Sequence, residues 1–100
     1  GVIGETMECQ HISYKFHALQ QMLTRGISKR EVEVVLRAGE IIATYPNDKP
    51  YPSRLMFCMV GFRPIHVVVA QDESDECYVV TAYEPDSKIW ENNFKTRRKP

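Results

Sequence analysis

The sequence predicts an α+β fold, with two N-terminal helices packed on a four-stranded antiparallel meander and a short C-terminal helix. Apolar residues recur at helical spacing over the first third of the chain. Four runs rich in β-branched residues follow, separated by turn-forming segments. Helices that precede a set of sequential strands are typical of the α+β class. Because 100 residues suit one domain, we expect a single domain over residues 14–94 and flexible termini at 1–13 and 95–100.

The first helix is predicted to begin near Tyr14 and to end at Gly26, a residue type that favours the position after a helix. Its apolar residues lie on one stripe, which we expect to be buried. The stripe consists of Phe16, Leu19, Met22 and Leu23.

The second helix has stronger local signals. Ser28 is followed three residues later by Glu31, the spacing of a capping box at a helix N-terminus. The residues predicted to face the core are Val32, Val35 and Leu36. Gly39 is expected to end the helix.

The strands are predicted at residues 40–45, 54–60, 63–70 and 78–85. Residues 54–60 are apolar on both faces, which favours a central strand covered by helices. The polar run 71–76 suits a hairpin loop. Asp86 or Ser87 is expected to cap the final short helix around Trp90.

The charge distribution limits the function classes. The chain carries 13 basic and 13 acidic residues, but four of the basic ones lie in the tail 95–99. Without these four, nine basic residues face 13 acidic ones, a net charge of −4. Because nonspecific nucleic-acid affinity comes mainly from phosphate neutralisation, any such role must depend on a local basic cluster or on the tail.

Cysteine usage and hydropathy predict a cytoplasmic protein. Cys9, Cys58 and Cys77 form an odd set without a CxxC pair, so we expect small buried thiols in a reducing cytosol. The sequence shows no apolar run of 18 residues and no signal peptide, so no membrane partner is expected.

The two strands on either side of the loop at 71–76 carry the best catalytic candidates. A hairpin symmetric about that loop places His66 opposite Thr81, with Tyr83 on the same face. An imidazole and a phenol on one face can form an acid/base site. The alternatives are a core histidine bonded to a neighbour and a half-buried tyrosine in contact with water.

Four further residues are candidates. His17 is a third catalytic candidate and lies on the same polar side of the first helix as Arg25. If this side lines a cleft, Arg25 can bind phosphate. The alternative is that both residues lie on a solvated face. Arg54 adds positive charge if its strand register places it beside His66. Trp90 either stacks on a base or packs on the sheet edge. The histidines are not paired at metal-ligand spacing, so neither a metal nor a cofactor is expected.

An ordered set of segments resembles a known family. The segments are 16–18, Met22, 25–28, 45–46, 52–53, 63–70, 81–85 and Trp90. They are similar to a family of small bacterial and archaeal proteins described as a domain of unknown function. Its genes often lie beside YgiT-type (MqsA-like) zinc-finger antitoxins, and it looks like a branch of the RelE/MqsR-like toxins in the barnase–EndoU–colicin–RelE group.

This resemblance implies a metal-independent endoribonuclease toxin of a type II toxin–antitoxin pair, with RNA and a zinc-finger antitoxin as partners. His17, Arg25, His66 and Tyr83 fall on the polar signature positions of the family. Gln21 departs from the arginine of many relatives, and the acidic body departs from the basic RelE-like toxins. The alternatives are a non-catalytic protein-binding module, which pairs through a sheet edge or the first helix, and a degenerate toxin that retains antitoxin binding.

Overall fold

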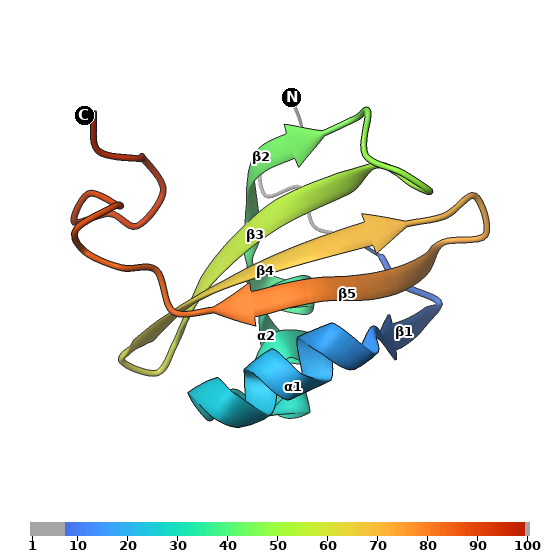
Figure 1. The fold of residues 1–100 in the computed structure, drawn as a ribbon, viewed down its shortest axis with the longest axis horizontal. Helices are drawn as coiled ribbons and strands as arrows, with labels where there is room; N and C mark the ends of the chain where they lie inside the picture. The colour runs from blue at the N-terminus through green and yellow to red at the C-terminus, as the bar shows by residue number, and fades with distance from the viewer. Residues whose placement is uncertain (1–7, 100) are drawn as a thin grey trace.

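The computed structural model describes residues 8–99, which form two helices and a five-stranded sheet (Figure 1). The strand order in the sheet is β1-β5-β4-β3-β2. In chain order the elements are β1 (His11–Tyr14), α1 (Phe16–Arg25), α2 (Lys29–Ala38), β2 (Glu40–Tyr45), β3 (Ser53–Val60), β4 (Arg63–Gln71) and β5 (Glu76–Tyr83).

The prediction of a four-stranded antiparallel meander with a C-terminal helix is wrong. The two helices are present, but β1 adds a fifth strand that pairs parallel with β5, so the sheet is mixed. In place of the last helix, the backbone N–H groups of Ile89 and Trp90 donate to the Asp86 carbonyl in a single turn. The chain then reverses, and Trp90 forms an isolated antiparallel bridge with Arg97.

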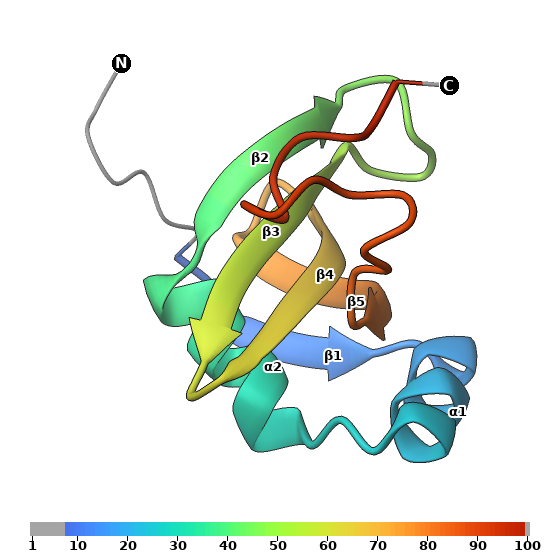
Figure 2. The ribbon, with the colours of Figure 1, turned by 90° about the vertical axis from the view of Figure 1, so that its left-hand side faces the viewer.

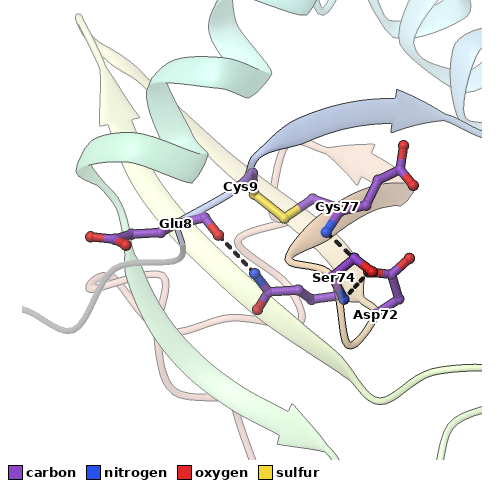
Figure 3. The surroundings of a disulfide bond; sticks show 7 residues. Glu8, Cys9, Asp72, Ser74 and Cys77 are labelled. Atoms are coloured by element: carbon purple, nitrogen blue, oxygen red, sulfur yellow. Dashed lines mark hydrogen bonds between the residues drawn. A yellow bond between two sulfur atoms is a disulfide. The ribbon is translucent and has the colours of Figure 1, made fainter.

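The N-terminal segment also differs from the predicted thiol pattern. Cys9 and Cys77 form a disulfide whose Cα atoms are 5.5 Å apart (Figure 3), so the prediction of buried free thiols is wrong for these two residues. No local pattern signals this pairing, because 68 positions separate the two cysteines and only the β1–β5 contact brings them together. The cysteines therefore do not support the expectation of a reducing cytosol.

One face of the sheet packs on the helices. Val32, Val35 and Leu36 of α2 are buried as predicted, and the capping box at the start of α2 is present. Both helices have ten residues, and in the part of the chain that the structure describes we find no helix with the length and apolarity needed to cross a membrane.

Helix α1 departs from the predicted stripe. Its buried residues are Ala18 and Met22, whereas Phe16 and Leu23 are 74% and 85% exposed. The reason is its position along β5 (Figure 1), where the sheet covers only a narrow side of the helix. At its C-terminal end, Gly26 adopts a left-handed conformation with φ of 66°, which costs glycine little.

Arg63, at the start of β4, fixes the end of α1. Its guanidinium donates to the carbonyls of Arg25 at 2.9 Å and Gly26 at 2.8 Å, groups that the helix itself leaves without partners. It also pairs with the carboxylates of Glu31 and Glu84. Its charge is therefore used within the fold.

The hairpin of β4 and β5 has a different register from the symmetric one. His66 pairs with Tyr83 and Val68 pairs with Thr81. Next to the turn the pairing is shifted by one residue from the prediction, because the Asp72 carboxylate accepts hydrogen bonds from the N–H groups of Ser74 and Glu76 (Figure 3). A β-bulge beside Val68 adds a second one-residue shift.

The other face of the sheet is covered by residues 85–98, which we call the C-terminal strap. This segment folds back over the sheet instead of projecting away from it (Figure 2). Phe94 packs near Phe57 of β3, with ring centroids 6.2 Å apart, and Lys95 pairs with Glu40 of β2 at 2.7 Å. Of the termini expected to be flexible, residues 1–7 and 100 lie outside the described residues.

Candidate functional site

His66 lies between the sheet and the C-terminal strap and is fully buried. Its ring contacts three aromatic rings from three different segments. The centroid distances are 4.6 Å to Trp90 of the strap, 5.3 Å to Tyr83 of β5 and 5.6 Å to Phe57 of β3. This enclosure holds the imidazole in one orientation.

Both nitrogens of His66 have partners. Nε2 lies 2.6 Å from the Phe94 carbonyl oxygen, and Nδ1 lies 3.3 Å from the Tyr83 hydroxyl. A carbonyl only accepts, so Nε2 must carry the proton and Nδ1 accepts from the phenol. Burial lowers the pKa of His66, and the bond to the Phe94 carbonyl opposes this shift. The imidazole is therefore neutral near pH 7 and able to accept a proton at Nδ1.

Tyr83 connects this buried group to the surface. Burial raises the pKa of its hydroxyl, with a further contribution from Tyr45, while Arg97 and Arg25 oppose the rise. The phenol is consequently protonated at neutral pH, and it lies within reach of the field of two cations.

Two hollows open beside Tyr83, and both are lined by Tyr83, Ile89 and Trp90. The first has a volume of about 450 Å³, and we call it the Arg25 hollow. The second has a volume of about 340 Å³, and we call it the Arg97 hollow. The residues that line only the first are Arg25, Glu84 and Asp86, and those that line only the second are Tyr45, Leu55 and Arg97.

Each hollow contains one arginine that neighbouring groups hold in place. Arg25 donates to the carbonyl of Ala82, beside Tyr83, at 2.9 Å. Arg97 lies over the Trp90 ring, with its guanidinium carbon 5.7 Å from the ring centroid. The carboxylates of the Arg25 hollow are both engaged, because Glu84 pairs with Arg63 and Asp86 accepts the N–H of Lys88. Among the described residues, neither arginine forms an ion pair with a carboxylate, so both are available to an anion.

Not all of the site residues predicted from the sequence lie beside Tyr83. The structure brings together His66, Tyr83, Arg25 and Trp90. His17 instead lies on the exposed surface of α1, where its Nε2 is 2.9 Å from the Gln21 amide, and it lines a separate hollow of about 330 Å³ with Arg25. Arg54 pairs with Val69, which belongs to the core under the helices, so it lies on the face opposite His66.

Trp90 supports the site from within. It is only 8% exposed, and it contacts both His66 and Arg97. The ring therefore has little free surface for stacking on a base.

Sequence reasoning missed three parts of the site: Tyr45, Arg97 and the Phe94 carbonyl. Tyr45 stands at the end of a predicted strand, a common place for functional side chains. Arg97 and Phe94 reach the site only because the strap folds back, and no local pattern signals that return. The resulting arrangement has a proton-transfer pair between two cations, which suits an anionic substrate that carries an ionisable hydroxyl.

Comparison with known proteins gives one match. A family model described as "Domain of unknown function (DUF4258)" matches residues 14–84. Neither the curated proteins nor the solved structures contain a match. The matched residues include His66, Tyr83 and Arg25 but end just before the strap.

Proposed function

We propose that this chain, which belongs to the DUF4258 family, is a metal-independent endoribonuclease that acts as the toxin of a type II toxin–antitoxin pair. The observation that carries the catalytic part is the Tyr83 hydroxyl, which is bonded to His66 and stands between Arg25 and Arg97. An RNA phosphodiester supplies both groups that this arrangement suits, an anionic phosphate and a neighbouring 2′-hydroxyl.

The reaction begins with the 2′-hydroxyl beside Tyr83. The Tyr83 oxygen takes the proton of the 2′-hydroxyl while its own proton passes to Nδ1 of His66, which lies 3.3 Å away. The 2′-oxygen then forms a bond to phosphorus, and the bond from phosphorus to the 5′-oxygen breaks. The leaving oxygen takes a proton from water. The products are a 2′,3′-cyclic phosphate and a 5′-hydroxyl.

His66 acts through Tyr83 and is a positioning residue. The Phe94 carbonyl, 2.6 Å from Nε2, fixes the tautomer that leaves Nδ1 free to accept. When Nδ1 gains a proton, the same carbonyl stabilises the imidazolium through a charge-assisted hydrogen bond. Tyr83, His66 and the Phe94 carbonyl together resemble the nucleophile, the histidine and the orienting acceptor of hydrolases.

Arg25 stabilises charge on the phosphorane, and Arg97 adds positive charge beside Tyr83. A guanidinium presents several N–H donors in a planar fork that matches phosphate oxygens. Arg25 is already fixed by Ala82, so little side-chain freedom is lost when it binds an anion.

Product chemistry tests the catalytic proposal. Purified protein is incubated with labelled RNA, with and without ribosomes, and the new ends are identified. We expect cyclic-phosphate ends that disappear when the RNA carries 2′-O-methyl groups. Tyr83→Phe should lower the rate at least about 100-fold, the usual loss for removal of an acid/base group. The matched control is Tyr51→Phe, which removes a phenol stacked on Tyr78 far from His66. Cleavage that Tyr83→Phe leaves intact would refute the proposal.

A second candidate function is supported by the exposed face of α1. Phe16 and Leu23 are 74% and 85% exposed and lie two turns apart on one side of the helix. Contiguous exposed apolar patches mark protein-binding surfaces, and two large apolar side chains on one side of a helix can contribute to such a patch. We propose that this face binds a zinc-finger antitoxin of the kind that the family resemblance implies, whether or not the chain cleaves RNA.

Coexpression with the protein encoded by the adjacent gene tests this candidate. Phe16→Ser combined with Leu23→Ser should abolish copurification and leave the folded state unchanged. The control is Phe62→Ser, which removes an even more exposed aromatic ring at the tip between β3 and β4. Copurification that survives the double change would place the partner elsewhere.

A further inference from the structure

The two hollows beside Tyr83 differ in chemistry. The Arg25 hollow contains polar and charged groups and opens beside the end of α1. The Arg97 hollow is lined by two tyrosines and one tryptophan, two aliphatic side chains and a single cation. A flat aromatic group with hydrogen-bond acceptors on one edge would fit these linings.

The walls of the Arg97 hollow provide both a stacking surface and directed donors. Tyr45, at the end of β2, is 39% exposed, and its ring offers a surface for stacking. Leu55 and Ile89 supply apolar contacts. Arg97 is held against Trp90 at 5.7 Å, which leaves the N–H edges of its planar guanidinium free to donate. No carboxylate or amide side chain is among the residues that line this hollow.

We propose that the Arg97 hollow is a nucleobase subsite that selects guanine, a specificity that rests on the endoribonuclease function proposed above. Guanine presents two adjacent acceptors, O6 and N7, which match two parallel N–H groups of an arginine. Adenine presents N7 beside an amino donor, which would face a second donor of Arg97. No carboxylate or amide oxygen, the usual side-chain partner of the amino groups of cytosine and adenine, lines this hollow.

The position of Tyr83 sets which nucleotide is read. Tyr83 lines both hollows. When the base occupies the Arg97 hollow and the ribose lies beside the Tyr83 hydroxyl, the 3′-phosphate of that ribose therefore points toward Arg25. The selected guanine therefore belongs to the nucleotide on the 5′ side of the scissile bond. The ligand that reproduces this half of the substrate is guanosine 3′-monophosphate.

Binding of the four nucleoside 3′-monophosphates, measured by calorimetry on the full chain, tests the proposal without any turnover. We expect guanosine 3′-monophosphate to bind at least about tenfold more tightly than the adenosine, cytidine and uridine forms, within the range that one bidentate contact supplies. Arg97→Gln should remove this preference. Arg97→Lys, which keeps the charge but not the fork, should also remove it. The control Lys99→Gln makes the same charge change in the same tail and should keep it.

The outcomes separate this inference from the proposed function. Equal binding of all four nucleotides, or a guanine preference that survives both Arg97 changes in folded protein, overturns the guanine subsite. If Tyr83→Phe still abolishes RNA cleavage in that case, the nuclease proposal stands alone. A guanine preference that Arg97→Gln abolishes, in a protein that cleaves no RNA, supports the subsite and refutes the nuclease.

Discussion

Loss of the Cys9–Cys77 disulfide is expected to destabilise the protein strongly. The test variant is Cys9→Ser, because Cys77 is fully buried and a buried thiol is well tolerated there. The disulfide joins the segment before β1 to β5 (Figure 3). Without it, β1 is held by four paired residues and by the contact of Tyr14 with Lys29 of α2.

The size of the effect follows from the length of the closed loop. A cross-link over a sequence separation of 68 residues removes unfolded-state entropy worth about 4 kcal/mol at 25 °C. Since domains of this size are stable by about 5–15 kcal/mol, this is a large share of the total. With a denaturant slope of about 2 kcal/mol/M, the urea midpoint should fall by about 2 M.

Two measurements check this reasoning. Thiol titration of the oxidised protein in denaturant should find one free thiol, that of Cys58, and three thiols would refute the disulfide. Urea denaturation of Cys9→Ser should then show the lower midpoint, with Cys58→Ser as a control that removes a sulfur without breaking a cross-link. If the wild type has one free thiol and Cys9→Ser lowers the free energy of unfolding by less than about 1 kcal/mol, the result would contradict the loop-entropy argument.

Three further outcomes are expected. Burial lowers the folded-state pKa of His66, so its contribution to stability is complete above the unfolded pKa of about 6.5. The free energy of unfolding falls as the pH drops from there toward the folded-state pKa, by up to about 1.4 kcal/mol per pH unit. Denaturation at a series of pH values should show a smaller dependence of this free energy on pH in His66→Gln. Arg63→Ala should cost about 2–3 kcal/mol, since it removes charge-assisted bonds to Glu31 and to the end of α1, and Arg63→Lys should recover less than half in the same denaturation assay. His17→Ala should leave the RNA cleavage rate within about twofold, because His17 lies outside the Tyr83 hollows; a loss comparable to that expected for Tyr83→Phe would put His17 back in the site.

Local signals explain which elements the sequence predicts well. Helix α2 has its capping residue, its apolar spacing and its end within twelve consecutive positions, from Ser28 to Gly39. Each of these signals acts between neighbours in the chain. The same is true of β2, which spans the predicted residues 40–45.

The register of β4 and β5 shows how a partly wrong prediction still placed two residues on one face. The turn set by Asp72 shifts the pairing by one residue, and the bulge at Val68 shifts it by one more. One shift reverses the face of every side chain, and two restore it. His66 therefore meets Tyr83 in place of the predicted Thr81.

Long-range pairing explains what the sequence did not predict. Strand β1 is only four residues long, and it forms because β5 offers an edge from more than sixty positions away. Arg97 lies in the tail that was predicted to be flexible, and Phe94 comes directly before that tail. Contacts with Trp90 and His66 nevertheless bring both residues to the site. Such contacts leave no periodic pattern in the sequence.

The most direct test of the central claim is a map of new RNA 5′ ends in cells after induced expression of the wild type, Tyr83→Phe and Tyr51→Phe. Cells contain ribosomes, so the assay detects both ribosome-dependent and independent cleavage. We predict new 5′ ends with the wild type and Tyr51→Phe, and none with a folded Tyr83→Phe. New ends that persist with Tyr83→Phe, or no new ends with the folded wild type, would contradict the account.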